Sequence, residues 1–378
     1  PAKRALNNNN NMKIQISKDI LLPILQSSNS FVERKQSQSI LANLFFVAEA
    51  GKLQITATDL EVELVSELAC SPLETGTMVL PARKLLEICK ALPNEAIILI
   101  EDFKTQAKLT SGRSKFTLMK LPAKEYPVTS EISPTLKFNM QKKVLIQLFE
   151  ETTFSMASQD VRYYLNGLLL EFSAKQIRAV ATDGHRLAMS EKEAEIEITK
   201  DLSVIIPRKG ILELLRLLQN TEEDELEVRI NKSHLSVNIG SQRMKTKLLE
   251  GNFPDYKRVI PPDAGDFILA DRNNLKGVLT RTSILSNEKF RGIRLNLTKS
   301  SIVAIAHNPE KEEAEEELSI EYDGGELEVG FNVAYLLDVL GIIRSDIVRL
   351  DIIDANHSCL IRDPENLKTQ YVVMPMRL

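Results

Sequence analysis

The pattern of apolar and polar positions contains a strand–helix block that occurs three times. In residues 205–220, IIPRKGILELLRLLQN, an apolar strand end is followed by a proline, two cations, and leucines spaced three and four apart. This order predicts a strand, a proline at the first helical position and an amphipathic helix. Residues 79–92, VLPARKLLEICKAL, show the same features, and residues 329–343, VGFNVAYLLDVLGII, have Asn332 at the position of the proline, no cation pair, and again a leucine-rich helical face. The block therefore recurs with a period of about 125 residues.

Two further markers recur with the same period. The first is a short alternating strand followed by a polar cap and a helix, and it begins at Met12, Leu136 and Phe267. The second is a strand that runs into a polar turn, as in ITATDLEVEL from Ile55, AVATDGHRLA from Ala179 and VAIAHNPEKE from Val303. The chain therefore holds three copies of one domain, each of about 120 residues and long enough to bury its own core.

Residues 1–11, PAKRALNNNNN, lie outside this repetition. The asparagine run is too polar to join a core, and it precedes a methionine, Met12, that could start a natural chain. We interpret this segment as an added leader. The predicted domains are residues 12–133, 134–263 and 264–378.

Short alternating runs fill the sequence between the predicted helices. Examples are ELEVRI from Glu225, HLSVNIG from His234, KTKLLEG from Lys245 and VRLDII from Val348, which read as strands of antiparallel meanders. Two helices and about eight strands per domain predict an α+β fold with the helices on one side of antiparallel sheets. Repeats that meet edge to edge generate an arc, and self-association can close such an arc.

Composition excludes several classes of protein. No run of eighteen apolar residues and no signal-peptide pattern is present, so we expect a cytosolic chain without a membrane anchor. Three widely separated cysteines, Cys70, Cys89 and Cys359, suit reduced thiols. The four histidines share no metal-ligand spacing with the cysteines or with one another, so we expect neither a metal nor a cofactor.

The net charge of −4 is unfavourable for binding nucleic acid, but the cations are concentrated at predicted helix starts. A cation there forgoes about 0.3 to 1 kcal/mol of favourable interaction with the helix dipole. Side-chain charge and free backbone N–H groups at a helix start can together bind a phosphate. Solvated lysines, or pairs with acids of another subunit, remain alternatives. The cations concerned are Arg83, Lys84, Lys142, Lys143, Arg208, Lys209, Arg272 and Lys276.

Acidic residues gather instead in residues 309–328, PEKEEAEEELSIEYDGGELE, which carry ten carboxylates against one lysine. Such a run is typical of a solvated face or of a protected edge strand. It could also pair with a basic edge, and SGRSKFTL at residues 111–118 provides one, because Arg113 and Lys115 lie beside Phe116 and Leu118.

Two segments are candidates for chemistry or binding. Asp183 and His185, in TDGHRLA, could form an acid–base pair, but the sequence has no nucleophile motif and no glycine-rich phosphate loop, so we favour a protein without catalytic residues. The terminal YVVMPMRL carries Met374 and Met376, which either form an adaptable apolar surface for partners or fill the core of the last sheet.

The segments from Met12 to Leu378 resemble, in order, those of the DNA polymerase III beta subunits, the replicative sliding clamps of bacteria. The segments that carry the resemblance are LPARKLLEICKALP, FSMASQDVRYYLNG, ATDGHRLA, IIPRKG, FPDYKRVIP, ILSNEKFRG, NPEKEEAEEEL, GFNVAYLLDVL and YVVMPMRL. The resemblance implies a head-to-tail homodimer closed into a ring around double-stranded DNA, with helices lining the hole. It implies a processivity factor for DNA replication with no active site of its own.

The resemblance also implies partners. They are a clamp loader, the DNA polymerase III alpha subunit, and other polymerases and repair proteins that bind through short linear motifs containing glutamine, leucine and phenylalanine. The implied peptide pocket lies between the second and third domains. Its residues are Leu165, Thr182, Gly184, His185, Arg186, Leu187, Pro254, Arg258, Val259, Tyr335, Ser358, Val372, Met374, Pro375, Met376, Arg377 and Leu378.

Two further sets of residues follow from the resemblance. The implied DNA contacts are sequence-independent and come from Lys35, Arg83, Gln159, Tyr163, Tyr164, Arg208 and Lys209. The implied dimer interface brings Lys84, Arg113, Lys115, Phe116 and Leu118 of one chain against Ile284, Leu285, Glu310, Glu313 and Glu316 of the other.

The sequence departs from the family at three points. Lys35 stands where arginine is common, and KQSQSILANLFF, which starts at Lys35, lacks a proline that is common before this strand, so the first DNA-facing loop is expected to differ in shape. The third repeat has Asn332 and Val333 in place of the cation pair. We therefore expect the first two domains to make most of the DNA contacts.

Overall fold

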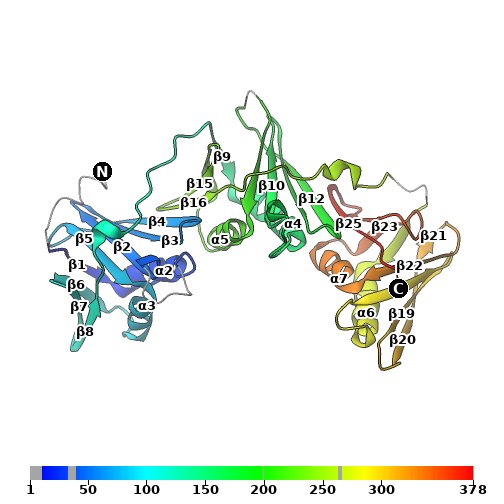
Figure 1. Ribbon diagram of the computed structural model, residues 1–378, viewed down its shortest axis with the longest axis horizontal. Helices are drawn as coiled ribbons and strands as arrows, with labels where there is room; N and C mark the ends of the chain where they lie inside the picture. Colours follow the sequence, from blue (N-terminus) through cyan, green and yellow to red (C-terminus); the bar gives the residue numbers. More distant parts are fainter. Residues whose placement is uncertain (1–10, 33–39, 199, 263–265, 378) are drawn as a thin grey trace. The chain divides into compact units, whose positions relative to one another are not determined.

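The computed structural model describes residues 11–32, 40–198, 200–262 and 266–377 (Figure 1). Within these residues the first and second repeats each contain two α-helices and eight strands, and the third contains two helices and nine strands. The predicted α+β class and the predicted element count are confirmed. The chain forms two compact units, one made of residues up to Lys143 with Leu212–Leu248, and one made of Val144–Ile211 with Leu249–Leu378.

The first unit contains an eight-stranded and a four-stranded antiparallel sheet, in the orders β5-β2-β3-β4-β16-β15-β14-β9 and β1-β6-β7-β8. Its helices α2 and α3 pack against each other. The elements are β1 (Lys13–Ser17), α2 (Lys18–Ser28), β2 (Asn43–Glu49), β3 (Lys52–Thr58), β4 (Val62–Ala69), β5 (Gly76–Pro81), α3 (Ala82–Ala91), β6 (Ile97–Phe103), β7 (Gln106–Ser111), β8 (Ser114–Met119), β9 (Leu136–Gln141), β14 (Glu225–Ile230), β15 (His234–Ile239) and β16 (Gln242–Lys247), with short 3-10 turns η1 (Ile40–Ala42) and η2 (Ala123–Glu125).

The second unit contains a nine-stranded and a four-stranded antiparallel sheet, in the orders β13-β10-β11-β12-β25-β24-β23-β17-β21 and β20-β19-β18-β22. Helices α4 (Lys142–Thr152) and α5 (Arg208–Gln219) each contain residues of both units. The other elements are β10 (Gly167–Phe172), β11 (Gln176–Thr182), β12 (Arg186–Glu193), β13 (Leu202–Pro207), β17 (Ile268–Asp271), α6 (Arg272–Thr282), β18 (Gly292–Leu297), β19 (Ser301–His307), β20 (Glu313–Ser319), β21 (Glu321–Tyr322), β22 (Leu327–Asn332), α7 (Val333–Ile342), β23 (Ile347–Asp351), β24 (Cys359–Asp363) and β25 (Asn366–Val373), with 3-10 turns η3 (Thr153–Ser155), η4 (Tyr163–Leu165), η5 (Tyr256–Arg258) and η6 (Ser283–Leu285).

Consecutive repeats meet through paired edge strands. In the first unit β4 of the first repeat pairs with β16 of the second, with Leu64 opposite Met244. In the second unit β12 of the second repeat pairs with β25 of the third, with Leu187 opposite Val372. The prediction that the repeats meet edge to edge is confirmed, and the main-chain ladder explains why each compact unit contains parts of two repeats.

The predicted strand–proline–helix block forms, with one correction. Pro81 and Pro207 are the last residues of β5 and β13, and the helices begin one residue later. Pro81 is the N-cap of α3, in extended conformation and paired with Asn43. The sequence predicted this proline at the first helical position, but in the structure it is the last residue of the strand. Asn332 takes this place in the third repeat, where its side chain accepts a hydrogen bond of 2.9 Å from the Ala334 N–H.

The cysteines behave largely as small apolar residues. All three are free thiols, and Cys89 and Cys359 are buried while Cys70 is half-buried. Burial, and then the charge of Asp351, raise the pKa of the Cys359 thiol well above its usual range. In the part of the chain that the structure describes, no group of three or more metal-binding side chains is close enough to hold an ion. No helix among the described residues is both long and apolar enough to cross a lipid bilayer.

Candidate partner-binding and DNA-facing sites

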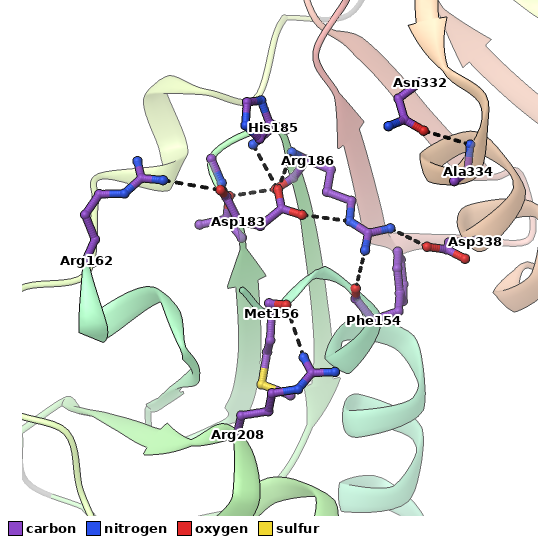
Figure 2. Close-up of polar contacts among 12 residues, drawn as sticks. Phe154, Met156, Arg162, Asp183, His185, Arg186, Arg208, Asn332, Ala334 and Asp338 are labelled. Atoms are coloured by element: carbon purple, nitrogen blue, oxygen red, sulfur yellow. Dashed lines mark hydrogen bonds and ion pairs between the residues drawn. The ribbon is translucent and has the colours of Figure 1, made fainter. Parts of the chain in front are cut away.

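The turn between β11 and β12 is built by its own side chains (Figure 2). The Thr182 hydroxyl donates to the Arg186 carbonyl at 2.6 Å and accepts from the Gly184 N–H at 3.1 Å. One Asp183 carboxylate oxygen accepts from the N–H groups of His185 and Arg186 at 2.9 and 3.0 Å. Gly184 has a φ of +89°, which glycine adopts without strain. Asp183 thus holds the main chain of the turn, and this role disfavours the acid–base alternative with His185.

Arg186 joins this turn to the third repeat. Its guanidinium donates to Asp183 at 3.1 Å and to the Phe154 carbonyl at 2.7 Å, and it also bonds Asp338 of α7. The same group lies 4.5 Å from the centre of the Tyr335 ring, a cation–π distance. Figure 2 shows Asp183, Phe154 and Asp338 converging on the Arg186 side chain from three segments. Because so many contacts hold it, Arg186 presents a fixed surface beside the turn.

An apolar cluster lies next to the turn. Leu187 of β12 and Val372 of β25 pair across the repeat boundary, and both belong to a buried cluster that includes Tyr256. Phe253 and Val259, from the loop before the third repeat, pack against this cluster while remaining partly exposed. The predicted partner residues therefore include both a buried floor and a half-buried rim.

The chain terminus lies along the same turn. The Met374 N–H donates to the His185 carbonyl at 2.9 Å, and the Met376 N–H donates to the Gly330 carbonyl at 2.8 Å. The Met374 side chain is 37% exposed, and Met376 is half-buried. The core-filling alternative is therefore wrong for Met374, whose side chain adds apolar surface next to His185.

The remaining predicted partner residues lie at different depths. Leu165 is buried in η4, beside Tyr164, which packs against the apolar cluster. Pro254 and Arg258 are exposed, and the Arg258 guanidinium pairs with Asp255 at 2.8 Å. Ser358 and Pro375 are half-buried and Arg377 is exposed, whereas Leu378 lies outside the described residues.

Arg162 also lies at this turn and was missed in the sequence. Its guanidinium binds both oxygens of Asp160, at 3.0 and 2.9 Å, and donates to the Asp183 carbonyl at 3.4 Å. A hydrogen bond from the Arg162 side chain lowers the pKa of Asp160 to about 2. Arg162 was identifiable only from its position two residues after an aspartate, which is a weak signal.

Five of the predicted DNA contacts come from the segment around η4 and the start of α5, namely Gln159, Tyr163, Tyr164, Arg208 and Lys209. Tyr163 is 53% exposed and lies edge-on to Tyr164, with ring centres 5.8 Å apart. Gln159 is exposed and has a φ of +59°. The Arg208 N–H donates to Asn166 at 2.9 Å, and its guanidinium donates to the Met156 carbonyl at 3.1 Å. Local hydrogen bonds therefore tie the start of α5 to the segment that carries Gln159 and Tyr163.

The other helix-start cations fall into two groups. Arg83 is exposed at the start of α3 and pairs with Glu87 at 2.9 Å. Lys142 and Arg272 instead donate to the carbonyls of Thr221 and Ser345, at 2.7 and 2.9 Å. These bonds favour a structural role for the two side chains, because they satisfy carbonyl groups of the same chain. Lys209 is half-buried in the first turn of α5, and Lys35 lies outside the described residues.

The predicted interface residues lie on two sheet edges. Strand β8 is the last strand of its sheet, with Lys115 exposed, Phe116 half-buried and Leu118 buried. Strand β20, which carries Glu313 and Glu316, is the last strand of its own sheet. Ile284 is 75% exposed, and Leu285 is half-buried beside it. Lys84, Arg113 and Glu310 are exposed, whereas Glu316 pairs with Arg281 at 2.9 Å within the chain.

Comparisons with known proteins agree with this architecture. The N-terminal, central and C-terminal domain models of the DNA polymerase III beta subunit match residues 12–130, 139–255 and 257–377. The beta sliding clamp of Pseudomonas aeruginosa is 47% identical over 369 residues, which cover 97% of this chain and all of that protein. The beta sliding clamp of Escherichia coli is 40% identical, with the same coverage.

A solved structure gives the same result. The crystal structure of the DNA polymerase III subunit beta from Pseudomonas aeruginosa superposes with a TM-score of 0.94, at 46% identity, over 97% of this chain and all of that one. Identity and coverage at this level extend the likeness from the fold to the whole sequence. The chain therefore belongs to the DNA polymerase III beta subunit family, the beta sliding clamps.

Proposed function

We propose that two copies of this chain close head to tail into a ring around duplex DNA and hold the replicative polymerase on its template. The observation that carries the proposal is the pairing of consecutive repeats by edge strands, which leaves β8 and β20 as edges of opposite charge. The first edge carries Arg113 and Lys115, and the second lies in the acidic run. Pairing these edges between two copies continues the edge-to-edge rule of the chain.

Contact with DNA needs to be weak for such a protein to slide. We infer that Lys35, Arg83, Gln159, Tyr163, Tyr164, Arg208 and Lys209 contact the sugar-phosphate backbone without reading the base sequence. Only four of these seven residues are cations, and the chain has a net charge of −4. This suits the role, because each additional phosphate contact adds salt-dependent affinity and slows movement along DNA. Topological enclosure, rather than affinity, then keeps the protein on DNA.

The surface next to the turn is proposed as the docking site for partner peptides. Leu187 and Val372 form its floor, Arg186 its polar side, and Met374 an adaptable apolar rim. An apolar site with a few fixed polar groups suits short motifs that combine leucine or phenylalanine with glutamine. The DNA polymerase III alpha subunit, other polymerases, repair proteins and the clamp loader would bind here in turn, in the bacterial cytoplasm.

Retention on circular DNA tests the proposal. The protein is loaded onto nicked circles by an ATP-driven clamp loader, and its dissociation is followed after free loader is removed. We expect long retention on the circle and rapid release once the circle is cut. Equal lifetimes on circular DNA and on linear DNA with open ends would refute enclosure.

A further inference from the structure

A polar network behind the apolar cluster connects the β10–β12 hairpins to the loop that follows β16. Arg178 of β11 donates to Glu191 of β12 at 2.6 Å and to Glu171 of β10 at 3.0 Å. It also donates to the Tyr256 hydroxyl at 3.0 Å, and this hydroxyl donates to Glu171 at 2.6 Å. The three charged side chains are 19 to 31% exposed, which makes their hydrogen bonds stronger than fully exposed ones.

The loop held by this network forms part of the candidate partner surface. Tyr256 is 5% exposed, and its ring packs in the same cluster as Leu187 and Val372. The neighbouring residues Pro254, Arg258 and Val259 are predicted partner contacts. Tyr256 is the one fully buried residue between Phe253 and Ile260, whose other residues are half-buried or exposed. The position of this loop therefore depends on where the Tyr256 hydroxyl is held.

The first repeat provides an internal comparison. The strand register places Val47, Gln54 and Glu67 where the second repeat has Glu171, Arg178 and Glu191. Equivalent bridges, Val79 to Leu121 and Ile205 to Leu249, begin the two corresponding loops. The charged network is therefore present in the repeat that carries the partner surface, and Gln54 and Val47 replace its centre in the repeat that does not.

The loop of the first repeat also carries a buried tyrosine, Tyr126, which is anchored differently. Tyr126 stacks on Phe45 at 5.2 Å, and its hydroxyl donates to the main-chain carbonyls of Asn43 and Thr56 at 3.4 and 3.2 Å. Burial, and then the hydrogen bond with Glu171, raise the pKa of Tyr256 to about 12. Both tyrosines are thus neutral and buried, but only the Tyr256 hydroxyl is held by side chains, which mutation can change.

We propose that Arg178, Glu171 and Tyr256 are positioning residues of the partner surface, which hold the loop of Pro254, Arg258 and Val259 in its peptide-binding place. This inference rests on the proposed peptide docking and adds to it residues that do not touch the peptide. When a binding-competent arrangement is only partly populated, the apparent affinity falls by the same fraction. Releasing the loop therefore weakens peptide binding without changing the bound complex.

The test uses the full chain and a fluorescein-labelled pentapeptide, Gln-Leu-Ala-Leu-Phe, in an anisotropy titration. Tyr256→Phe removes one hydroxyl and keeps the buried ring, so we expect the dissociation constant to rise about 3- to 10-fold with unchanged anisotropy at saturation. Arg178→Met should weaken binding at least as much. Tyr126→Phe is the control, since it removes a buried tyrosine hydroxyl from the loop of the first repeat, and its dissociation constant should stay within about twofold of wild type.

Hydrogen exchange separates loop positioning from general destabilisation. We expect faster exchange in Tyr256→Phe to be confined to the amides of residues 253–260. Wild-type affinity in Tyr256→Phe, equal weakening in Tyr126→Phe, or faster exchange throughout the second unit would each overturn the inference alone. A wild-type protein that stays on circular DNA but does not bind the peptide would overturn the proposed docking surface, and the inference with it.

Discussion

A buried ion pair lies at the junction of the first two repeats and allows a quantitative prediction. Lys245 of β16 and Glu63 of β4 approach to 2.9 Å, with side chains only 10% and 6% exposed. Thr129, in the segment between the repeats, bonds both of them, and Lys245 also donates to the Ser130 carbonyl at 3.3 Å. Both charges are therefore removed from water and depend on each other.

Replacing one partner should cost far more than replacing both. Lys245→Met leaves the Glu63 carboxylate buried without its cation, which typically costs about 3 to 5 kcal/mol. The double variant Glu63→Gln with Lys245→Met removes both charges, and we expect a cost within about 1 kcal/mol. A decrease of 3 kcal/mol in the free energy of local opening corresponds to roughly 100-fold faster amide exchange.

Amide hydrogen exchange in β4 and β16 measures this opening directly. A suitable control is Lys13→Met, because Lys13 pairs with Glu101 at 2.8 Å with both side chains 33% exposed, so its loss should have a much smaller effect. If the double variant exchanged as fast as Lys245→Met, the pair would not act through mutual neutralisation, and packing of the lysine side chain would explain the loss.

Three further predictions concern assembly, partners and pH. Charge reversal at Arg113 or Lys115 should weaken dimerisation more at low salt than at high salt in sedimentation experiments, and a salt-independent loss would instead assign the interface energy to its apolar residues. Removal of residues 374–378 should abolish binding of the polymerase and the clamp loader with the dimer intact, and loss of the dimer would make this tail structural. The lowered pKa of Asp160 stabilises the folded turn above the unfolded value of 3.8, so exchange in residues 160–166 should accelerate as the pH falls from about 4 towards 2, and Arg162→Met should remove this dependence.

The repeats and their strands were predictable because local periodicity determines them. The spacing of leucines in residues 205–220 and the alternation in ELEVRI depend only on neighbours in sequence. The turn at Asp183 was singled out for its Asp183–His185 pair and through the family resemblance, whereas its hydrogen bonds, which are formed within five residues, were seen only in the structure.

Contacts across long sequence distances were not predictable. Arg186 binds Asp338 and the Phe154 carbonyl, and no sequence pattern in either segment indicates a contact with a residue so distant in sequence. Lys142, Arg208 and Arg272 carry the same helix-start signature, and their side chains reach three carbonyls in different segments, those of Thr221, Met156 and Ser345. The sequence shows at which helix start a charged residue lies, but the packing of neighbouring segments determines which acceptor its side chain reaches.

The ladders between β4 and β16 and between β12 and β25 have a consequence for the modularity of the chain. Each ladder satisfies main-chain groups of two repeats at once, so a repeat cut out at its sequence boundary would present a bare strand ready to pair with any other. We expect isolated single repeats to aggregate. We therefore expect recombination to exchange the repeats only together with their neighbours, although the copies share one sequence pattern.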